Sequence, residues 1–444
     1  MKPTIGRAFA AAALLAPLAC LAADWPTFMA GPQHRGVADG AARLAVETLR
    51  LAWRFEVHAT VSASPVVADG RLFVGAENGN LYAIDLRSGQ LQWLFHARGG
   101  IASTPAVADG LVVFLARDGS LHALDAATGS AAWTFRTQGE AVVSAHGMYG
   151  MPMTPEPVPD PWDLYLSSPL IHEGKVYVGS SDQRVYALEL RSGRLVWAFK
   201  TGGTVHSSPA LAGRNVVVGS WDGAVYALDA ASGAEQWRFQ TQTEQKLSIM
   251  LGIQASPSVD GDTVYIGSRD GFFYALDSAS GQRKWRYDAK GAWVVGTAAI
   301  DADKVYVGTS DSGLLLALDK RCGAEQYRYA TKVWTFASPV RAGDALFGAS
   351  MKGELVALDA ASGALRWQYR TDDSRLDPYR IIDPASGGFD NARLYGAGRQ
   401  DQLHAALEHV KRLGAFIASP LWHDGQLIAV SGNGEVLVFA AAPQ

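Results

Sequence analysis

The chain repeats one short phrase: an acidic residue, a glycine four positions later, and an aromatic residue four positions after the glycine. The tryptophans of successive copies keep a regular spacing, because Trp93 and Trp133 lie 40 residues apart and so do Trp197 and Trp237. The glycines of the copies are Gly89, Gly129, Gly193, Gly233, Gly281, Gly323 and Gly363. A period near 40 residues predicts stacked supersecondary units, so one ring can account for all 444 residues.

Each repeat contains four short runs of alternating β-branched and aromatic residues. In the first full copy the runs are separated by Asp69-Gly70, Asn78-Gly79 and Ser88-Gly89. Such pairs are typical of tight turns between antiparallel strands. Four antiparallel strands per 40-residue unit predict one blade of a β-propeller.

The number of blades follows from the first strands, which begin after a serine or threonine that usually precedes proline. These residues are Ser64, Thr104, Ser168, Ser208, Ser256, Thr297, Ser338 and Ser419. The last copy stops one strand short, while residues 51–55 upstream carry the Trp-x-aromatic signature of a fourth strand. We therefore predict an all-β, eight-bladed propeller whose last blade is closed by the N-terminal strand, which removes exposed sheet edges.

The aromatic residues of the phrase are predicted to supply apolar area between neighbouring blades. They are Trp53, Trp93, Trp133, Trp197, Trp237, Trp285, Tyr327 and Trp367. The acidic residue can bond the following turn, and the glycine can adopt positive φ there. These residues are interpreted as structural and not catalytic.

Composition and the first residues indicate an exported protein. A net charge of −4 argues against nucleic acid as a partner. Residues 1–23 combine Lys2 and Arg7 with a short apolar run and small residues, as in a signal peptide. Residues 24–50 form a lead-in segment and 51–442 the propeller. A periplasmic or secreted monomer is expected; Cys20 is either removed with the signal or lipidated as an outer-membrane anchor.

The phrase Ala-Leu-Asp-x-x-Ser/Thr-Gly-x-x-x-Trp resembles the repeat of propellers related to pyrroloquinoline quinone (PQQ) enzymes, over about residues 24–440. The start Asp24-Trp25-Pro26-Thr27-Phe28 also resembles that of PQQ-dependent alcohol dehydrogenases. This resemblance implies one of two functions. Quinoprotein dehydrogenases bind PQQ and calcium in the central funnel, whereas propellers similar to the outer-membrane assembly lipoprotein BamB have no cofactor. The chain lacks the adjacent cysteines typical of the enzymes.

Three segments are longer than the repeat requires: about residues 141–164, 241–254 and 372–416. All three connect one blade to the next, so they are expected on one face, where they mark a binding surface or are merely tolerated loops. The first contains His146, Met148, Met151 and Met153, which are weak candidates for a Cu(I) site and otherwise fill gaps. In the last, residues 401–413 are expected to form a helix with Leu403, Leu407, Val410 and Leu413 on one face.

Candidate ligand-binding residues precede the first strands, which line the central channel in propellers. They are His206, Lys246, Gln254, Trp293 and Trp334. Either they bind a polar or planar ligand at the funnel mouth, or they plug the channel and satisfy one another. No catalytic residue or metal site is assigned. We expect a non-catalytic envelope scaffold that binds a protein or small ligand on the looped face; the alternative is a PQQ- and calcium-dependent oxidoreductase acting on an alcohol or sugar.

Overall fold

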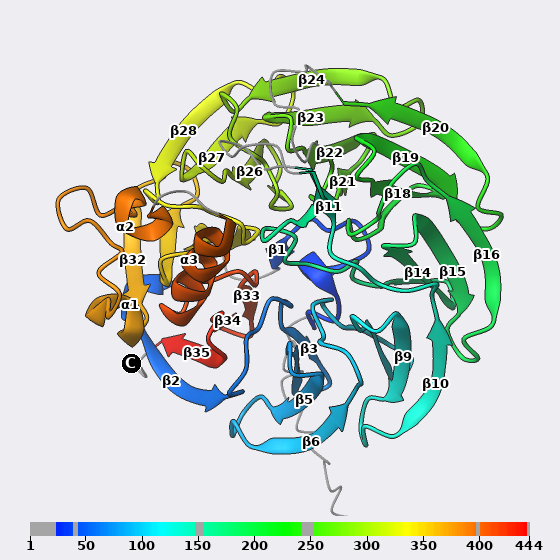
Figure 1. Ribbon diagram of the computed structural model, residues 1–444, viewed down its shortest axis with the longest axis horizontal. Helices are drawn as coiled ribbons and strands as arrows, with labels where there is room; N and C mark the ends of the chain where they lie inside the picture. Colours follow the sequence, from blue (N-terminus) through cyan, green and yellow to red (C-terminus); the bar gives the residue numbers. More distant parts are fainter. Residues whose placement is uncertain (1–23, 39–42, 147–154, 242–251, 397–399, 442–444) are drawn as a thin grey trace, which may run out of the picture.

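The computed structural model describes residues 24–38, 43–146, 155–241, 252–396 and 400–441. Eight four-stranded antiparallel sheets are arranged around a central axis, which confirms the eight-bladed propeller (Figure 1). Strands follow one another outward from the axis in chain order within blades 1 to 7. Seven of the hydrophobic clusters lie between neighbouring blades or along the closing blade, so the core is a series of blade interfaces.

The first four blades have these bounds. Blade 1 comprises β3 (Val66–Ala68), β4 (Arg71–Gly75), β5 (Asn80–Asp85) and β6 (Leu91–His96). Blade 2 comprises β7 (Ala106–Ala108), β8 (Leu111–Leu115), β9 (Ser120–Asp125) and β10 (Ala131–Arg136). Blade 3 comprises β13 (Leu170–His172), β14 (Lys175–Ser180), β15 (Arg184–Glu189) and β16 (Leu195–Lys200). Blade 4 comprises β17 (Ala210–Ala212), β18 (Asn215–Gly219), β19 (Ala224–Asp229) and β20 (Glu235–Gln240).

The other four blades repeat the pattern. Blade 5 comprises β21 (Ser258–Asp260), β22 (Thr263–Gly267), β23 (Phe272–Asp277) and β24 (Arg283–Asp288). Blade 6 comprises β25 (Ala299–Ile300), β26 (Lys304–Gly308), β27 (Leu314–Asp319) and β28 (Glu325–Ala330). Blade 7 comprises β29 (Val340–Ala342), β30 (Ala345–Ser350), β31 (Glu354–Asp359) and β32 (Leu365–Arg370). Blade 8 comprises β33 (Leu421–His423), β34 (Gln426–Val430), β35 (Glu435–Ala441) and β2 (Leu49–Glu56).

The two ends of the chain meet in blade 8. Strand β2 pairs antiparallel with β35, in a register that runs from Leu49 opposite Ala441 to Glu56 opposite Glu435. The predicted closure by the N-terminal strand is therefore confirmed. Strand β2 thus supplies the fourth strand that the C-terminal part of the chain lacks, and blade 8 has the same four strands as the other blades.

The repeated aromatic residue joins each blade to the next. Its ring N–H, or the hydroxyl of Tyr327, donates to a main-chain carbonyl of the following blade at 2.8–3.2 Å. The glycine of the next copy lies directly under this ring: Gly233 has φ +73°, and a Cβ there would come within 2.6 Å of Trp197. The phrase in the sequence is thus the signature of an inter-blade contact, and its glycine is needed for both backbone conformation and space.

The lead-in segment crosses the propeller at the end of the channel where first strands turn into second strands. The first strands of five blades donate main-chain N–H groups to carbonyls of the lead-in. The blades are 2, 4, 5, 6 and 7, and the accepting residues are, in the same order, Pro26, Pro32, Gln33, Arg35 and Gly36. Trp25 exchanges two further hydrogen bonds with Val67 of blade 1. The segment includes η1 (Phe28–Ala30) and β1 (Val37–Ala38), which pairs parallel with β29, and η2 (Val46–Thr48) leads into β2. The lead-in therefore closes this end of the channel.

The described parts of the first and last insertions lie together on the other face (Figure 1). The first contains the small hairpin β11 (Ser144–Ala145) and β12 (Val158–Pro159). The last contains α1 (Asp372–Leu376), α2 (Asn391–Tyr395) and α3 (Gln400–Arg412). Leu403, Leu407, Val410 and Leu413 are buried against the ring, as the helical pattern predicts. We call this surface the insertion face.

Several sequence predictions fall outside the described residues. These are the signal segment with Cys20, the methionines Met148, Met151 and Met153, and Lys246 in the second insertion. None of the helices among the described residues combines the length and apolar character needed to cross a membrane.

Candidate functional site at the channel mouth

The narrow part of the channel is a ring of hydroxyl groups. Seven of the eight serine or threonine residues that begin first strands accept, through the side-chain oxygen, the main-chain N–H of the equivalent residue in the preceding blade. Seven such hydrogen bonds of 2.8–3.0 Å run around the ring, and the bond from Ser419 N–H to Ser64 crosses the closure. The Ser/Thr-Pro pattern in the sequence is therefore explained by contacts between blades.

Two series of residues surround the channel mouth on the insertion face. One lies two positions before each ring hydroxyl and includes His206, Gln254 and Phe336. The other occupies the turn between second and third strands and includes Trp221 and Arg269. The main-chain N–H of the turn residue donates to the carbonyl four positions before the ring hydroxyl of the same blade, as from Trp221 to Thr204 and from Arg269 to Gly252. The repeat thus delivers variable side chains to fixed positions around the mouth.

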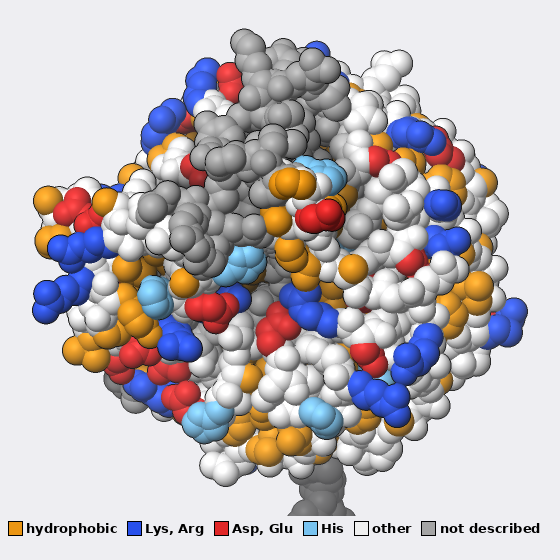
Figure 2. Space-filling view, viewed as in Figure 1, with side chains coloured by type: hydrophobic (Ala, Val, Ile, Leu, Met, Phe, Trp, Pro, Cys, Tyr) orange, Lys and Arg blue, Asp and Glu red, His pale blue; other side chains and the backbone are white. Residues whose placement is uncertain are grey.

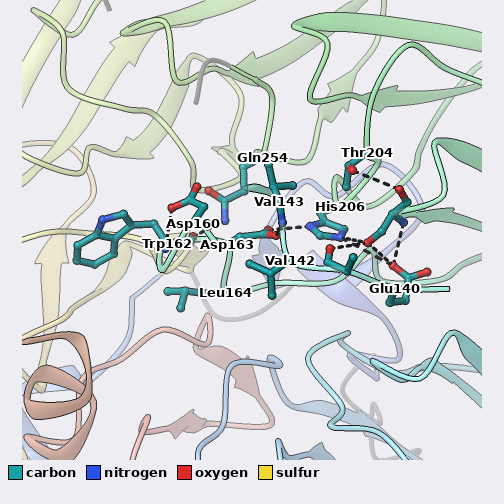
Figure 3. A network of polar contacts seen from close by, with 12 residues as sticks. Glu140, Val142, Val143, Asp160, Trp162, Asp163, Leu164, Thr204, His206 and Gln254 are labelled. Carbon is teal, nitrogen blue, oxygen red and sulfur yellow. Dashed lines mark hydrogen bonds and ion pairs between the residues drawn. The ribbon is translucent and has the colours of Figure 1, made fainter. Parts of the chain in front are cut away.

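The end of the first insertion fills this mouth. Residues 160–164, which we call the plug, lie over the channel within reach of side chains from several blades (Figure 3). Asp160, Trp162, Asp163 and Leu164 are all buried. Figure 2 shows acidic and basic side chains side by side at the centre of this face.

Arg269 holds the first half of the plug. Its guanidinium is fully buried between the rings of Trp221 and Trp293, with Cζ 4.4 and 4.2 Å from their centroids. It forms an ion pair with the carboxylate of Asp160, which is also fully buried. Burial raises the pKa of Asp160, and Arg269 opposes this change. A buried cation stacked on two indoles and paired with one carboxylate is a strong, directional attachment.

Gln254 completes the attachment of this half. Its side-chain oxygen accepts from Arg269 Nε at 3.1 Å and Nη2 at 2.6 Å, and its Nε2 donates to the carbonyl of Trp162 at 2.8 Å. Arg269 Nη2 reaches the same carbonyl at 3.3 Å. The main chain of the plug is therefore bound as well as its side chains.

His206 holds the second half of the plug. Its Nδ1 lies 2.7 Å from Asp163 Oδ1, and its Nε2 lies 2.7 Å from Ser181 Oγ and 3.8 Å from Glu140 Oε2 (Figure 3). Burial lowers the pKa of His206, but Asp163 and Glu140 outweigh this effect and raise it. Burial likewise raises the pKa of Asp163, but His206 outweighs it and the pKa is lowered. An imidazolium between carboxylates is the state that these shifts favour.

Ser181, His206 and Asp163 have the connectivity of a hydrolytic triad, but their chemistry differs from one. The Ser181 hydroxyl has a single proton and lies 2.8 Å from Glu140 Oε2 and 2.9 Å from the carbonyl of Ala141. When the Ser181 hydroxyl donates its hydrogen bond to Glu140, its oxygen can only accept a hydrogen bond from His206. The imidazole then cannot take a proton from the serine. Glu140 also accepts from Ser180 Oγ at 2.6 Å and Ser181 N–H at 2.9 Å. The group is therefore a clamp that joins both ends of the insertion to blades 3 and 4.

The apolar side of the mouth closes around Trp162. Its ring meets Trp334 edge-on with centroids 4.7 Å apart and stacks on Phe336 at 5.7 Å. Trp334 in turn contacts Phe389 of the last insertion at 4.9 Å. Tyr165, just after the plug, donates its hydroxyl to the carbonyl of Ile417 at 3.0 Å. The two insertions thus form one cover over the channel.

The space that remains in the channel is small. A cavity of about 30 Å³ lies between the hydroxyl ring and the cover, lined also by Phe28, Tyr165 and Phe336. This volume holds roughly two water molecules. The described residues therefore do not form a site for a tricyclic quinone while the plug is in place. Nor do three or more His, Cys, Asp or Glu side chains converge as a metal site within the described ranges.

The predicted mouth residues are distributed as follows. His206 and Gln254 contact the plug, Trp293 stacks on Arg269, and Trp334 packs on Trp162. Four of the five predicted residues thus contact the plug or Arg269, and Lys246 lies outside the described residues. Sequence reasoning missed Arg269, Trp221, Asp160, Trp162 and Asp163. The first two precede the turn aspartates Asp270 and Asp222, so reading that position in every repeat would have found them.

Four further side chains that could take part in chemistry lie outside the plug: His146, Glu408, His409 and Cys322. His146 follows β11, and its three partner methionines are outside the described residues. In the last insertion His409 stacks on Tyr379 at 4.2 Å, and Glu408 pairs with Lys411. Cys322 is exposed and its thiol lies 3.4 Å from Asp319, in the place of the usual turn serine.

Solved structures with the same fold include both kinds of protein that the sequence resembles. BamB from Moraxella catarrhalis has 19% identity and a TM-score of 0.64, covering 88% of this chain and 99% of its own. Quinohemoprotein alcohol dehydrogenase from Comamonas testosteroni has 16% identity and a TM-score of 0.70, covering 95% and 81%. A europium-containing methanol dehydrogenase has 15% identity and a TM-score of 0.65, covering 94% and 98%. These likenesses show the fold alone. No curated protein matches the sequence.

Family models separate the two kinds more clearly. The model for the β-propeller domain of glucose, ethanol and alcohol dehydrogenases matches only residues 96–206. The model described as outer membrane protein assembly factor BamB matches residues 40–149, 162–292 and 269–444, which together span most of the propeller. The chain therefore belongs to the propeller family described as outer membrane protein assembly factor BamB.

Proposed function

We propose that this protein is a non-catalytic scaffold of the cell envelope that holds a protein partner on the insertion face. One observation carries the proposal: His206, Gln254 and Arg269 at the channel mouth are engaged in holding the plug. Ser181, the nearest approach to a nucleophile, faces His206, whose pKa is raised by its carboxylate neighbours. The family assignment and the signal-like residues 1–23 support an envelope location.

Exposed apolar side chains on the insertion face offer a contact surface. Val142 in the first insertion is 40% exposed and Leu376 at the end of α1 is 76% exposed. Leu91 on the outer strand β6 is 45% exposed and lies on the rim, so it provides a matched control. Val142 and Leu376 therefore provide one accessible position in each insertion at which a contact can be tested.

The test compares capture of envelope proteins by the mature chain and by three variants. We expect Val142→Glu and Leu376→Glu to lose a partner that the wild type and Leu91→Glu retain, identified by mass spectrometry after crosslinking. Equal recovery with all four proteins, or loss with Leu91→Glu alone, would contradict a contact through the insertion face.

A quinoprotein dehydrogenase is the second candidate, because residues 96–206 match the dehydrogenase propeller model. This function requires the plug to leave the mouth. Titration with PQQ and calcium, followed by absorbance and dye-linked oxidation of alcohols and sugars, distinguishes the candidates. We expect no binding at micromolar cofactor; saturable binding with turnover would replace the scaffold proposal.

A further inference from the structure

The plug is bound in the manner of a short peptide ligand. Two carboxylates three residues apart, Asp160 and Asp163, each meet a buried basic side chain of the ring, Arg269 and His206. Trp162 between them enters an aromatic pocket, and its carbonyl is held by Gln254 and Arg269. Arg117 Nη2 donates to the carbonyl of Leu164 at 3.2 Å. An aromatic anchor flanked by desolvated charge pairs is typical of the residues that dominate binding at protein interfaces.

Closing the mouth does not require these charges. Buried ion pairs often stabilise no more than well-packed apolar residues, because desolvation opposes the attraction. The last insertion shows that this ring can be covered without them, since Leu403, Leu407 and Val410 pack on the same cluster through apolar contacts. The cations His206 and Arg269 belong to the repeat framework of blades 4 and 5, whereas their carboxylate partners come from the insertion or its flank. The ring therefore carries a recognition surface that is independent of the segment now filling it.

We propose that the channel mouth is a binding site for an acidic peptide segment with the pattern Asp-x-Trp-Asp, and that residues 160–164 occupy it as an internal ligand. This inference rests on the proposed scaffold function and names the class of partner. In it, Arg269 recognises the first carboxylate, His206 recognises the second, and Trp334 with Phe336 recognises the indole.

The plug competes with a partner peptide for the same site and so lowers the apparent affinity of the protein for that peptide. A tethered segment competes at a high effective concentration, so a partner peptide binds the wild-type protein only as far as the plug is displaced. Removing or weakening the plug should therefore expose the full affinity of the site.

The chain offers a clean way to remove the plug. Deleting residues 141–164 leaves nine residues between Arg136 at the end of β10 and Leu170 at the start of β13. Nine residues also connect β6 to β7, β16 to β17 and β28 to β29. The deletion thus restores the ordinary connection of the repeat and needs no added linker.

The probe is a synthetic peptide with the sequence of residues 157–164, and binding is measured by calorimetry and by fluorescence of its tryptophan. We expect the deletion variant to bind it saturably, with at least tenfold weaker binding to the wild type. Peptides carrying the equivalent of Asp160→Asn with Asp163→Asn, or of Trp162→Ala, should each bind the deletion variant at least tenfold more weakly.

Two results would overturn the inference: a folded deletion variant that does not bind the peptide, or equal binding of the altered peptides. Circular dichroism and a cooperative thermal transition establish folding. Where the deletion does not fold, the full-length double variant Asp160→Asn with Trp162→Ala takes its place, and it must bind the wild-type peptide more tightly than the wild-type protein does. If the peptide does not bind but partner capture still depends on Val142 and Leu376, only the peptide site is rejected. If the peptide does not bind and partner capture does not depend on these residues, the scaffold function is rejected as well.

Discussion

The two described insertions cover the same channel mouth by opposite means. The plug at the end of the first is attached through buried charges, with Asp160 on Arg269 and Asp163 on His206. Helix α3 of the last is attached through an apolar stripe that includes Leu407 and Val410. Charge attachment depends strongly on geometry and on protonation, whereas apolar attachment depends mainly on buried area. The attachment of one half of the cover is therefore sensitive to geometry and protonation, and that of the other half is set mainly by its buried apolar area.

The largest effect should come from breaking the Arg269 pair. Asp160→Ala leaves a fully buried guanidinium without its carboxylate, which destabilises a protein by about 3–5 kcal/mol. Urea denaturation followed by tryptophan fluorescence measures the loss. The control is Arg191→Ala, whose own side chain is 69% exposed and whose partner Asp109 is 59% exposed, so it should lose less than about 1 kcal/mol. Equal losses of unfolding free energy in the two variants would show that the buried ion pair of the plug contributes no more than an exposed one, and would contradict attachment of the plug through buried charges.

Truncating the apolar half should follow in size. Leu407→Ala removes a buried side chain from the cluster under α3, at an expected loss of about 3 kcal/mol. This loss should be the same at pH 6 and pH 9, because the packing at Leu407 is apolar. Glu408→Ala on the exposed side of α3 is the control and should change stability by about 0.5 kcal/mol or less. A strong pH dependence of the Leu407 effect would show that the two halves are not independent.

The propeller could be predicted from the sequence because equivalent residues make the same contacts in successive blades. The aromatic residue, the glycine beneath it and the ring hydroxyl recur in register, and each proved to be an inter-blade contact. The lead-in gave no comparable signal, since it binds first strands through main-chain carbonyls that any residue supplies. Its path across the channel followed only from the structure.

The plug could not be predicted for a different reason. Its contacts join residues far apart in the chain, with Asp160 and Arg269 separated by 109 positions, and each pair occurs once. The periodicity of the sequence predicts where each residue of a repeat lies in its blade. It does not predict which residues from other parts of the chain a side chain that occurs only once will contact. The positions of His206 and Gln254 in the repeat predict side chains at the mouth, but the insertion that contacts them lies outside the repeat.

A pH dependence should distinguish the charged half further. The pKa of His206 is raised in the folded protein, so its stabilising contribution is fully present below the unfolded value near 6.5 and is lost as pH rises through the folded value. Each whole unit by which the pKa is raised corresponds to about 1.4 kcal/mol. The difference in unfolding free energy between wild type and His206→Gln should therefore shrink between pH 6 and pH 9.

The acid side has the opposite sign for Asp163. Because its folded pKa is lowered, its contribution is present above the unfolded value and is lost as pH falls through the folded one. The clamp is thus strongest between these two limits. A His206→Gln variant that tracks the wild type in parallel across pH 6–9 would contradict a protonated histidine in the clamp.

The smallest effect concerns the hydrogen bond that joins the two halves. Tyr165→Phe removes the hydroxyl that donates to the carbonyl of Ile417 and leaves the ring in place, so the expected loss is about 1 kcal/mol. Burial raises the pKa of Tyr165, in keeping with a hydroxyl that stays protonated. Combined with Asp160→Ala, the substitution forms a double-mutant cycle. An interaction energy above about 0.5 kcal/mol would show that loss of the charged attachment is transmitted to the apolar half, whereas additive losses would show that the two insertions are held independently.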